Sequence, residues 1–184
     1  KTFHLADEAF FTKLNGAKLL VNTSRGEVVN TIALRNAIDN GIISTAVLDV
    51  WENEPNIDNE LLNKVYLSTP HIAGYSADGK ANGTAICVRG VSSFFNLGIS
   101  DEWYPSSVPL PANTKELTFE CAGKSDQEIL SEVIIATYNI SHDDEKLRKS
   151  VDTFEKQRNE YPIRREFQFY RIKLHNGNQK LNLI

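Results

Sequence analysis

The chain has 184 residues, of which 41% are hydrophobic and 24% charged, and its formal net charge is −4. This composition is typical of soluble globular proteins, and no segment is basic enough to neutralise many phosphates, so we expect no nucleic-acid partner. No apolar run approaches the ~20 residues of a membrane-spanning helix, so we expect no membrane partner. Cys87 and Cys121 lie in apolar surroundings without metal-ligand spacing, which predicts reduced thiols in a cytoplasmic protein and no metal site.

Helix-like and strand-like segments alternate in the first part of the chain. The predicted helices cover 6–15, 31–40 and 59–64, and the predicted strands cover 18–22, 42–50 and 65–68. Strands joined through helices form parallel sheets with right-handed crossovers, so the sequence predicts an α/β fold that begins with the second half of a Rossmann-type parallel-sheet domain. No G-x-G-x-x-G word occurs, and the glycine-rich turn that holds a dinucleotide pyrophosphate is expected to be missing.

Three polar residues follow three of these strands. Arg25 lies in VNTSRGEVV, Glu54 in VLDVWENEP and His71 in STPHIAG, at separations of 29 and 17 residues. Because ligands bind at the carboxyl ends of parallel strands, we expect the three side chains to converge at one edge of the sheet. An arginine can hold a carboxylate through paired hydrogen bonds. A histidine can take a hydroxyl proton while a glutamate orients its ring.

Each residue alone also has an ordinary interpretation: Arg25 as a solvated turn residue, Glu54 as a solvated loop residue and His71 as a hydrogen-bonded turn residue. The ordered set favours the functional interpretation. The words SRG, LDVWENEP and TPHIAG, at these separations, resemble the D-2-hydroxyacid dehydrogenase family over residues 1 to about 98. Members of that family oxidise a 2-hydroxy acid with a nicotinamide cofactor, so the resemblance implies an oxidoreductase that uses NAD.

The resemblance also assigns roles to individual residues. It implies that Arg25 binds the substrate carboxylate, that His71 is the general acid/base and that Glu54 orients it. It implies that Tyr75 contacts the substrate together with Arg25. The cofactor contacts that it implies are Thr23, Ser24, Arg25, Asp49 and Gly74. The alternatives are a strand-end cap for Asp49 and a simple turn for Gly74. In the family the glycine-rich turn lies upstream of the residue that matches Lys1, so the chain alone is expected to be inactive.

The second part of the chain predicts a different organisation. Apolar residues at helical spacing predict a long helix over 76–97, and the proline-rich stretch 100–114 is typical of a linker. Beyond it, the sequence predicts strands at 116–121 and 166–174, and helices at 126–139, with Ser125 as N-cap, at 143–149 and at 151–161. So small an α/β unit buries too little surface to be comfortably stable alone, so we expect it to have a partner.

Three words in this part, GYSADGKANGT, DDEKLRK and FEKQRNEYPIRREF, resemble a branch of the same family that carries a C-terminal dimerisation domain and acts on a phosphorylated hydroxy acid. The resemblance implies a homodimer formed through that domain. Candidate ligands for the phosphate of the partner's substrate are Arg148, Lys149, Arg164 and Arg165. The predicted domains are the C-terminal half of the NAD-binding domain (1–74), a helix returning to the substrate domain (75–99), a linker (100–114) and the dimerisation domain (115–184).

Two other functions remain open at this point. The chain could be a non-catalytic dimerisation or interaction module, which the intact Arg25, Glu54 and His71 disfavour. It could also belong to a D-2-hydroxyacid dehydrogenase that acts on another substrate, such as a phosphoglycerate. The second part of the chain disfavours that alternative, because it does not resemble a regulatory ligand-binding domain.

Overall fold

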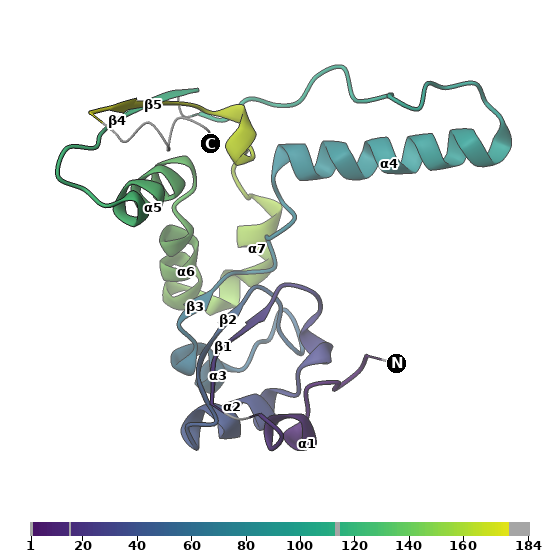
Figure 1. Cartoon of the computed structure of the whole chain (residues 1–184). Coiled ribbons are helices and arrows are strands. Elements are labelled where there is room, and N and C mark those ends of the chain that lie inside the picture. Colours follow the sequence, from purple (N-terminus) through teal and green to yellow (C-terminus); the bar gives the residue numbers. More distant parts are fainter. Residues whose placement is uncertain (1, 15, 113–114, 177–184) are drawn as a thin grey trace. The chain divides into compact units, whose positions relative to one another are not determined.

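The computed structural model describes residues 2–14, 16–112 and 115–176 (Figure 1). The chain divides into two compact units: residues 1–73 with 140–161, and residues 74–139 with 162–184. The first unit thus contains a segment that the sequence assigned to the dimerisation domain, and the predicted domain boundaries stay a prediction. The two units are described separately below.

A parallel three-stranded sheet is the centre of the first unit. Its strands are β1 (Ala17–Asn22), β2 (Ile43–Leu48) and β3 (Leu67–Ser68), in the spatial order β1-β2-β3. Leu48 at the end of β2 pairs with Ser68 of β3, so the carboxyl ends of these strands share one edge. The predicted parallel α/β arrangement is confirmed.

The helix α1 (Glu8–Phe11) precedes β1, while α2 (Thr31–Asp39) and α3 (Asn59–Lys64) connect the three strands. Each begins after an Asp or Asn whose side chain accepts a hydrogen bond from a backbone N–H of the first turn, as expected for N-caps: Asp7, Asn30 and Asp58. The helix α1 is shorter than the predicted 6–15, because Ala6 forms a β-bridge with Val29 and the helix starts only after it.

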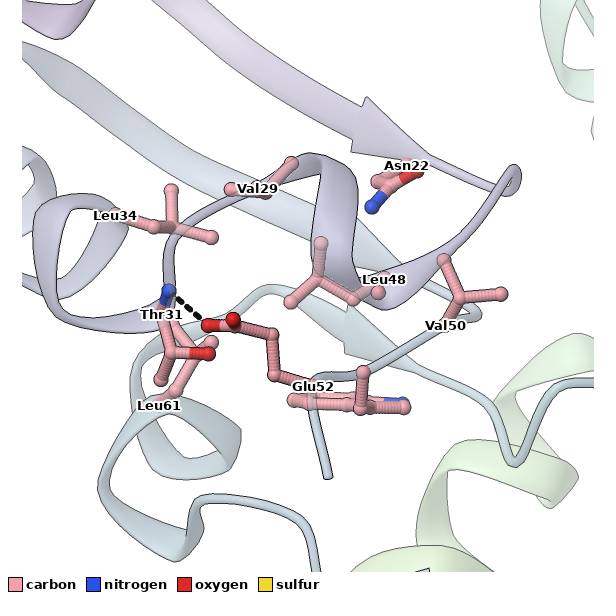
Figure 2. A pocket seen from close by; sticks show the side chains of 10 residues that line it. Asn22, Val29, Thr31, Leu34, Leu48, Val50, Glu52 and Leu61 are labelled. Carbon is pink, nitrogen blue, oxygen red and sulfur yellow. Dashed lines mark hydrogen bonds between the residues drawn. The ribbon is translucent and has the colours of Figure 1, made fainter. Parts of the chain in front are cut away.

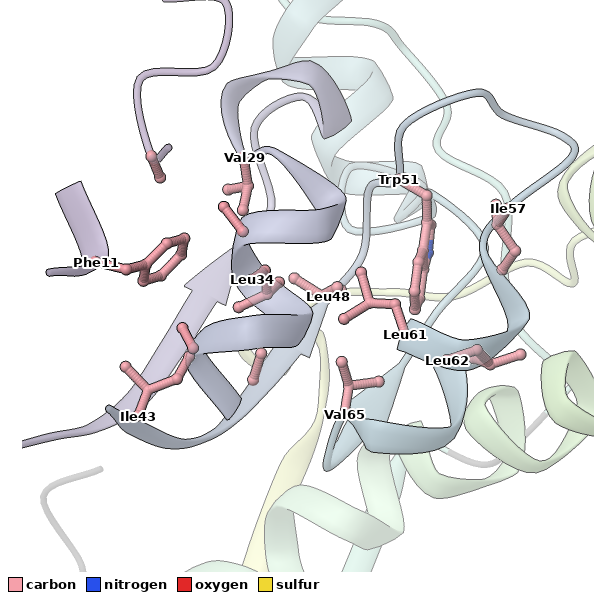
Figure 3. Packing of buried hydrophobic residues seen from close by; sticks show 14 of the residues in the cluster. Phe11, Val29, Leu34, Ile43, Leu48, Trp51, Ile57, Leu61, Leu62 and Val65 are labelled. Atoms are coloured by element: carbon pink, nitrogen blue, oxygen red, sulfur yellow. The ribbon is translucent and has the colours of Figure 1, made fainter. Parts of the chain in front are cut away.

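The core of the first unit includes residues from distant parts of the sequence (Figure 3). Side chains of the sheet and of α2, such as Leu34 and Leu48, pack with Trp51. The segment 140–161 forms α6 (Ile140–Lys149), a short 3-10 helix η2 (Val151–Thr153) and α7 (Phe154–Asn159). Leu147 of α6 and Phe154 of α7 are 0% exposed and belong to the same core. These helices are therefore an integral part of the first unit.

The second unit begins with the predicted long helix. Its elements are α4 (Ala77–Phe95), β4 (Glu116–Glu120), α5 (Asp126–Thr137), the 3-10 helix η3 (Phe167–Phe169) and β5 (Arg171–His175). Strands β4 and β5 are parallel, and α5 contributes Ile129 to a small core with Cys121. The predicted cap Ser125 is confirmed and forms a capping box with Glu128. Among the described residues, no helix is both long and apolar enough to cross a membrane.

The predicted strand 166–174 is wrong in its first half. The alternation of FQFYRIKL extends through Phe167–Phe169, yet these residues form η3, and the strand begins only at Arg171. The cause is a long-range contact, because the backbone N–H of Glu166 donates to Asp78 Oδ2 at 2.7 Å. The chain then turns, with Phe169 N donating to Glu166 O.

Asp78, in the first turn of α4, forms a buried ion pair with Arg165. The guanidinium donates from Nη2 to Oδ1 and from Nε to Oδ2, both at 2.9 Å, and the two side chains are 13% (Arg165) and 8% (Asp78) exposed. The hydrogen bond from Arg165 outweighs the effect of burial and holds the pKa of Asp78 below its usual value. The ion pair thus joins α4 to the segment that precedes β5.

We expect Asp78→Asn to lower the free energy of unfolding near pH 7 by about 3 kcal/mol, because Arg165 loses the charge that compensates its burial. The pKa of Asp78 is lower in the folded than in the unfolded chain, so its contribution is complete above about pH 3.8. That contribution is lost as the pH falls through the folded-state pKa. Urea unfolding at several pH values should therefore show a difference between variant and wild type that shrinks in acid. The exposed Asp101→Asn is the control, and a pH-independent difference would contradict the ion-pair explanation.

Candidate active site

The turn after β1 is shaped by Asn22. This side chain is 6% exposed, and its Oδ1 accepts hydrogen bonds from Ser24 N at 3.1 Å and Ser24 Oγ at 2.8 Å. Its Nδ2 donates to Arg25 O at 3.0 Å. An Asn that bonds to the backbone two and three residues ahead fixes a turn. Thr23, Ser24 and Arg25 are consequently presented on the surface at the carboxyl end of the sheet.

Gly26 brings this turn against the loop that follows β2. A Cβ atom on Gly26 would lie 2.0 Å from both the backbone C and the backbone O of Trp51. Only glycine therefore fits at this position. The close approach holds the backbone after Arg25 beside the loop that carries Glu54.

Glu54 and His71 meet as the sequence predicted. His71 Nδ1 lies 2.8 Å from Glu54 Oε2, and the two side chains are 27% and 20% exposed, respectively. Glu54 Oε1 accepts a hydrogen bond from Trp51 N at 2.9 Å, and Trp51 Nε1 donates to Thr69 O at 3.0 Å. If Nδ1 carries the hydrogen that is donated to the carboxylate, Nε2 has the free lone pair. The pair is thus arranged for Nε2 to accept a proton.

Asp49 holds the segment that contains His71. It is 4% exposed, and its Oδ1 accepts from Thr69 Oγ1 and Ile72 N, both at 2.7 Å. Its Oδ2 accepts from Ala73 N at 3.0 Å, and its backbone O accepts from His71 N at 2.7 Å. These contacts are the ones expected if Asp49 caps the end of its strand, which was the alternative interpretation of this residue. Because a carboxylate has about four acceptor positions, the predicted contact with the nicotinamide remains compatible with them and stays a prediction.

Two further residues predicted at the site belong to the second unit. A Cβ at Gly74 would meet no protein atom within 4 Å, so close packing within the chain does not explain the glycine. Tyr75 lies under Lys80, whose Nζ is 4.4 Å from the ring centroid. Their roles in binding stay predictions. Of the candidate phosphate ligands, Arg165 is engaged by Asp78.

Sequence patterns did not single out Glu52, which lies two residues before Glu54 in the chain. Glu52 Oε2 accepts from Thr31 N at 2.6 Å, and Oε1 lies 2.5 Å from His4 Nε2. Burial opposes ionisation of Glu52, but the hydrogen bonds from His4 and Thr31 prevail and lower its pKa. Glu52, Thr31 and Asn22 line a cavity of about 10 Å³ (Figure 2), which is close to the space that one water needs.

Comparisons with known proteins find similar sequences over most of the chain. Residues 1–73 match the family described as D-isomer specific 2-hydroxyacid dehydrogenase, NAD binding domain. Residues 111–184 match a domain of unknown function, DUF3410. Erythronate-4-phosphate dehydrogenase of Bacteroides thetaiotaomicron is 46% identical over 172 residues, which cover 94% of this chain and 46% of the relative. The enzyme of the same name from Teredinibacter turnerae is 38% identical over 177 residues, with 93% and 46% coverage.

Solved structures are similar over part of the chain, and a D-mandelate dehydrogenase is one example. The holo form of Rhodotorula graminis D-mandelate dehydrogenase is 32% identical over 60% of this chain and 32% of its own, with a TM-score of 0.47. The chain spans about half the length of the curated relatives that it matches. Together these matches show what the chain is similar to: residues 1–73 are similar to the NAD-binding domain of D-2-hydroxyacid dehydrogenases, and nearly the whole chain is similar to erythronate-4-phosphate dehydrogenases.

Proposed function

We propose that the protein containing this chain oxidises 4-phospho-D-erythronate to 2-oxo-3-hydroxy-4-phosphobutanoate with NAD, a reaction of pyridoxal phosphate biosynthesis in the cytoplasm. The observation that carries the proposal is the 2.8 Å contact between His71 Nδ1 and Glu54 Oε2 in a segment that matches an NAD-binding domain of 2-hydroxyacid dehydrogenases. The substrate comes from the name of the curated relatives.

The side chains at the sheet edge supply the proton chemistry. Nε2 of His71 takes the proton of the C2 hydroxyl while the hydrogen on C2 leaves with its electron pair, and the C2–O single bond becomes a carbonyl. The carboxylate of Glu54 holds the imidazole in place and stabilises its protonated form. The guanidinium of Arg25 is exposed and binds the substrate carboxylate through paired hydrogen bonds. NAD, when bound, is the acceptor of the hydride.

The residues of the first unit fit part of a dinucleotide site. Asn22 holds the exposed turn of Thr23, Ser24 and Arg25 at the carboxyl edge of a parallel sheet, where such folds bind nucleotides. Asp49 caps the neighbouring segment. These residues would line the nicotinamide side of the cofactor.

The function is tested by a substrate panel. The catalytically active protein is supplied with NAD and with 4-phospho-D-erythronate, D-erythronate or D-3-phosphoglycerate, and the initial rate of NADH formation is measured. The proposal expects kcat/KM to be highest for 4-phospho-D-erythronate. A higher kcat/KM for phosphoglycerate would assign another substrate. An absence of NADH with all three compounds would favour the non-catalytic alternative.

We further propose that the protein is a homodimer formed through the segment after the linker. The two-stranded sheet of the second unit has only a small core, and several large apolar side chains near it are about half exposed: Ile134, Ile135, Ile163 and Phe167. A two-fold pairing would cover this apolar surface.

Sedimentation velocity of the chain at tens of micromolar tests this proposal. We expect a dimer, and we expect Ile135→Asp to shift it toward the monomer, because a charge would replace an apolar contact. Gln127→Asp, an exposed position on the same helix, is the matched control. A wild-type monomer at this concentration would rule the proposal out.

A further inference from the structure

The edge strand β3 is held from its outer side by α6. Asp144 Oδ1 accepts hydrogen bonds from Ser68 N at 2.7 Å and from Ser68 Oγ at 2.5 Å. Ser68 is 0% exposed. In the described part of the chain, β3 is the last strand in the order β1-β2-β3, so one of its edges has no neighbouring strand. The backbone N–H of Ser68 bonds to the Asp144 carboxylate.

Arg148 fixes this carboxylate in turn. Its Nε donates to Asp144 Oδ2 at 2.9 Å, while Nη1 and Nη2 donate to Leu62 O at 2.6 Å and Val65 O at 3.1 Å. These carbonyls lie at the carboxyl end of α3, where a cation is favoured. One guanidinium therefore ties α6 to the end of α3, and it reaches β3 through Asp144. Burial opposes ionisation of Asp144, but hydrogen bonds from Arg148 and Ser68 keep its pKa below the usual value.

The strand held in this way leads directly to the candidate general base. Ser68 is followed by Thr69, which donates from Oγ1 to Asp49 and accepts from Trp51 Nε1 through its carbonyl. His71 is two residues further on. Asp49 and Trp51 therefore hold this segment on one side, and Asp144 holds the strand before it on the other. The fully buried Leu147 anchors α6 in the same core.

We propose that Asp144 and Arg148 are positioning residues for His71, and that the segment matching a domain of unknown function thereby contributes to the catalytic geometry. The pair fixes β3, and β3 fixes the point from which His71 reaches Glu54. This inference rests on the proposed role of His71 as the base. It gives the segment after the linker a second task beside dimerisation.

The test compares Asp144→Asn and Asp144→Ala in the catalytically active protein with Glu145→Gln, which alters the exposed ion pair of Glu145 with Lys149 on the same helix. Small displacements of a catalytic group cost up to about 10²-fold in rate, so we expect kcat to fall about 10-fold in Asp144→Asn and further in Asp144→Ala. The KM for NAD should change little. Glu145→Gln should resemble the wild type.

A second measurement does not depend on activity. Hydrogen exchange of the amides of His71, Ile72 and Ala73 should become faster in Asp144→Asn and Ser68→Ala, and should not change in Glu145→Gln. If folded Asp144→Asn keeps the wild-type kcat and exchange rates, the proposal is overturned. If His71→Ala retains full turnover, the proposed function fails instead, while the exchange rates still decide whether Asp144 fixes the segment.

Discussion

Replacing His71 with Ala in the catalytically active protein should lower kcat by at least about 10²-fold while the affinity for NAD is kept, because the proton acceptor is lost and the cofactor contacts are not. Steady-state kinetics with 4-phospho-D-erythronate give kcat, and a calorimetric titration with NAD gives the affinity. Near-normal turnover of this variant would remove His71 from the mechanism.

A second variant changes Glu54, the carboxylate that bonds to His71. Glu54→Gln keeps the shape of the side chain and can still accept a hydrogen bond from Trp51 N, but it loses the charge beside His71. We expect a smaller loss of kcat than in His71→Ala. Steady-state kinetics measure this loss, and a wild-type kcat in Glu54→Gln would show that Glu54 does not act on the base.

The substitution Gly26→Ala should have the second large effect. Its Cβ would lie 2.0 Å from the backbone of Trp51, and backbone atoms cannot move aside as a flexible side chain can. We expect the free energy of unfolding to fall by about 3 kcal/mol or more. In the active protein, kcat/KM should also fall, because the turn that presents Arg25 must separate from the loop that carries Glu54.

Urea unfolding measures the first effect, and Gly83→Ala is the matched control. A Cβ at Gly83 meets nothing within 4 Å, and alanine in a helix is favoured over glycine by up to about 1 kcal/mol. The control should therefore be neutral or stabilising. Equal stability of Gly26→Ala and the wild type would mean that the contact with Trp51 is not required.

The sequence predicted those features that depend on local patterns. Apolar runs broken by polar residues located the three strands, and the rule for parallel sheets brought Glu54 and His71 to one edge before any contact was known. The predicted N-cap Ser125 followed the same local logic, and the structure confirms it. The fold of the first unit was predictable because its strands and helices alternate at short range.

Features that depend on distant pairs were not predictable. Asp144 bonds to Ser68 across 76 positions and Arg165 bonds to Asp78 across 87, and neither separation leaves a periodic signal in one sequence. For this reason the sequence offered Arg148 and Arg165 as phosphate ligands, whereas the structure engages them with Asp144 and Asp78. The predicted strand also starts too early, at Glu166, because of a distant pair. In the structure the backbone N–H of Glu166 donates to Asp78, and the strand begins only later.

The direct test of the central claim follows the hydrogen on C2 of the substrate. The active protein is given NAD and 4-phospho-D-erythronate that carries deuterium at C2, and the reduced cofactor is analysed by mass spectrometry. A dehydrogenase that removes the hydroxyl proton through His71 and transfers the C2 hydrogen as a hydride predicts one deuterium in the NADH that is formed. Release of that deuterium into water, with unlabelled NADH or none, would contradict the account.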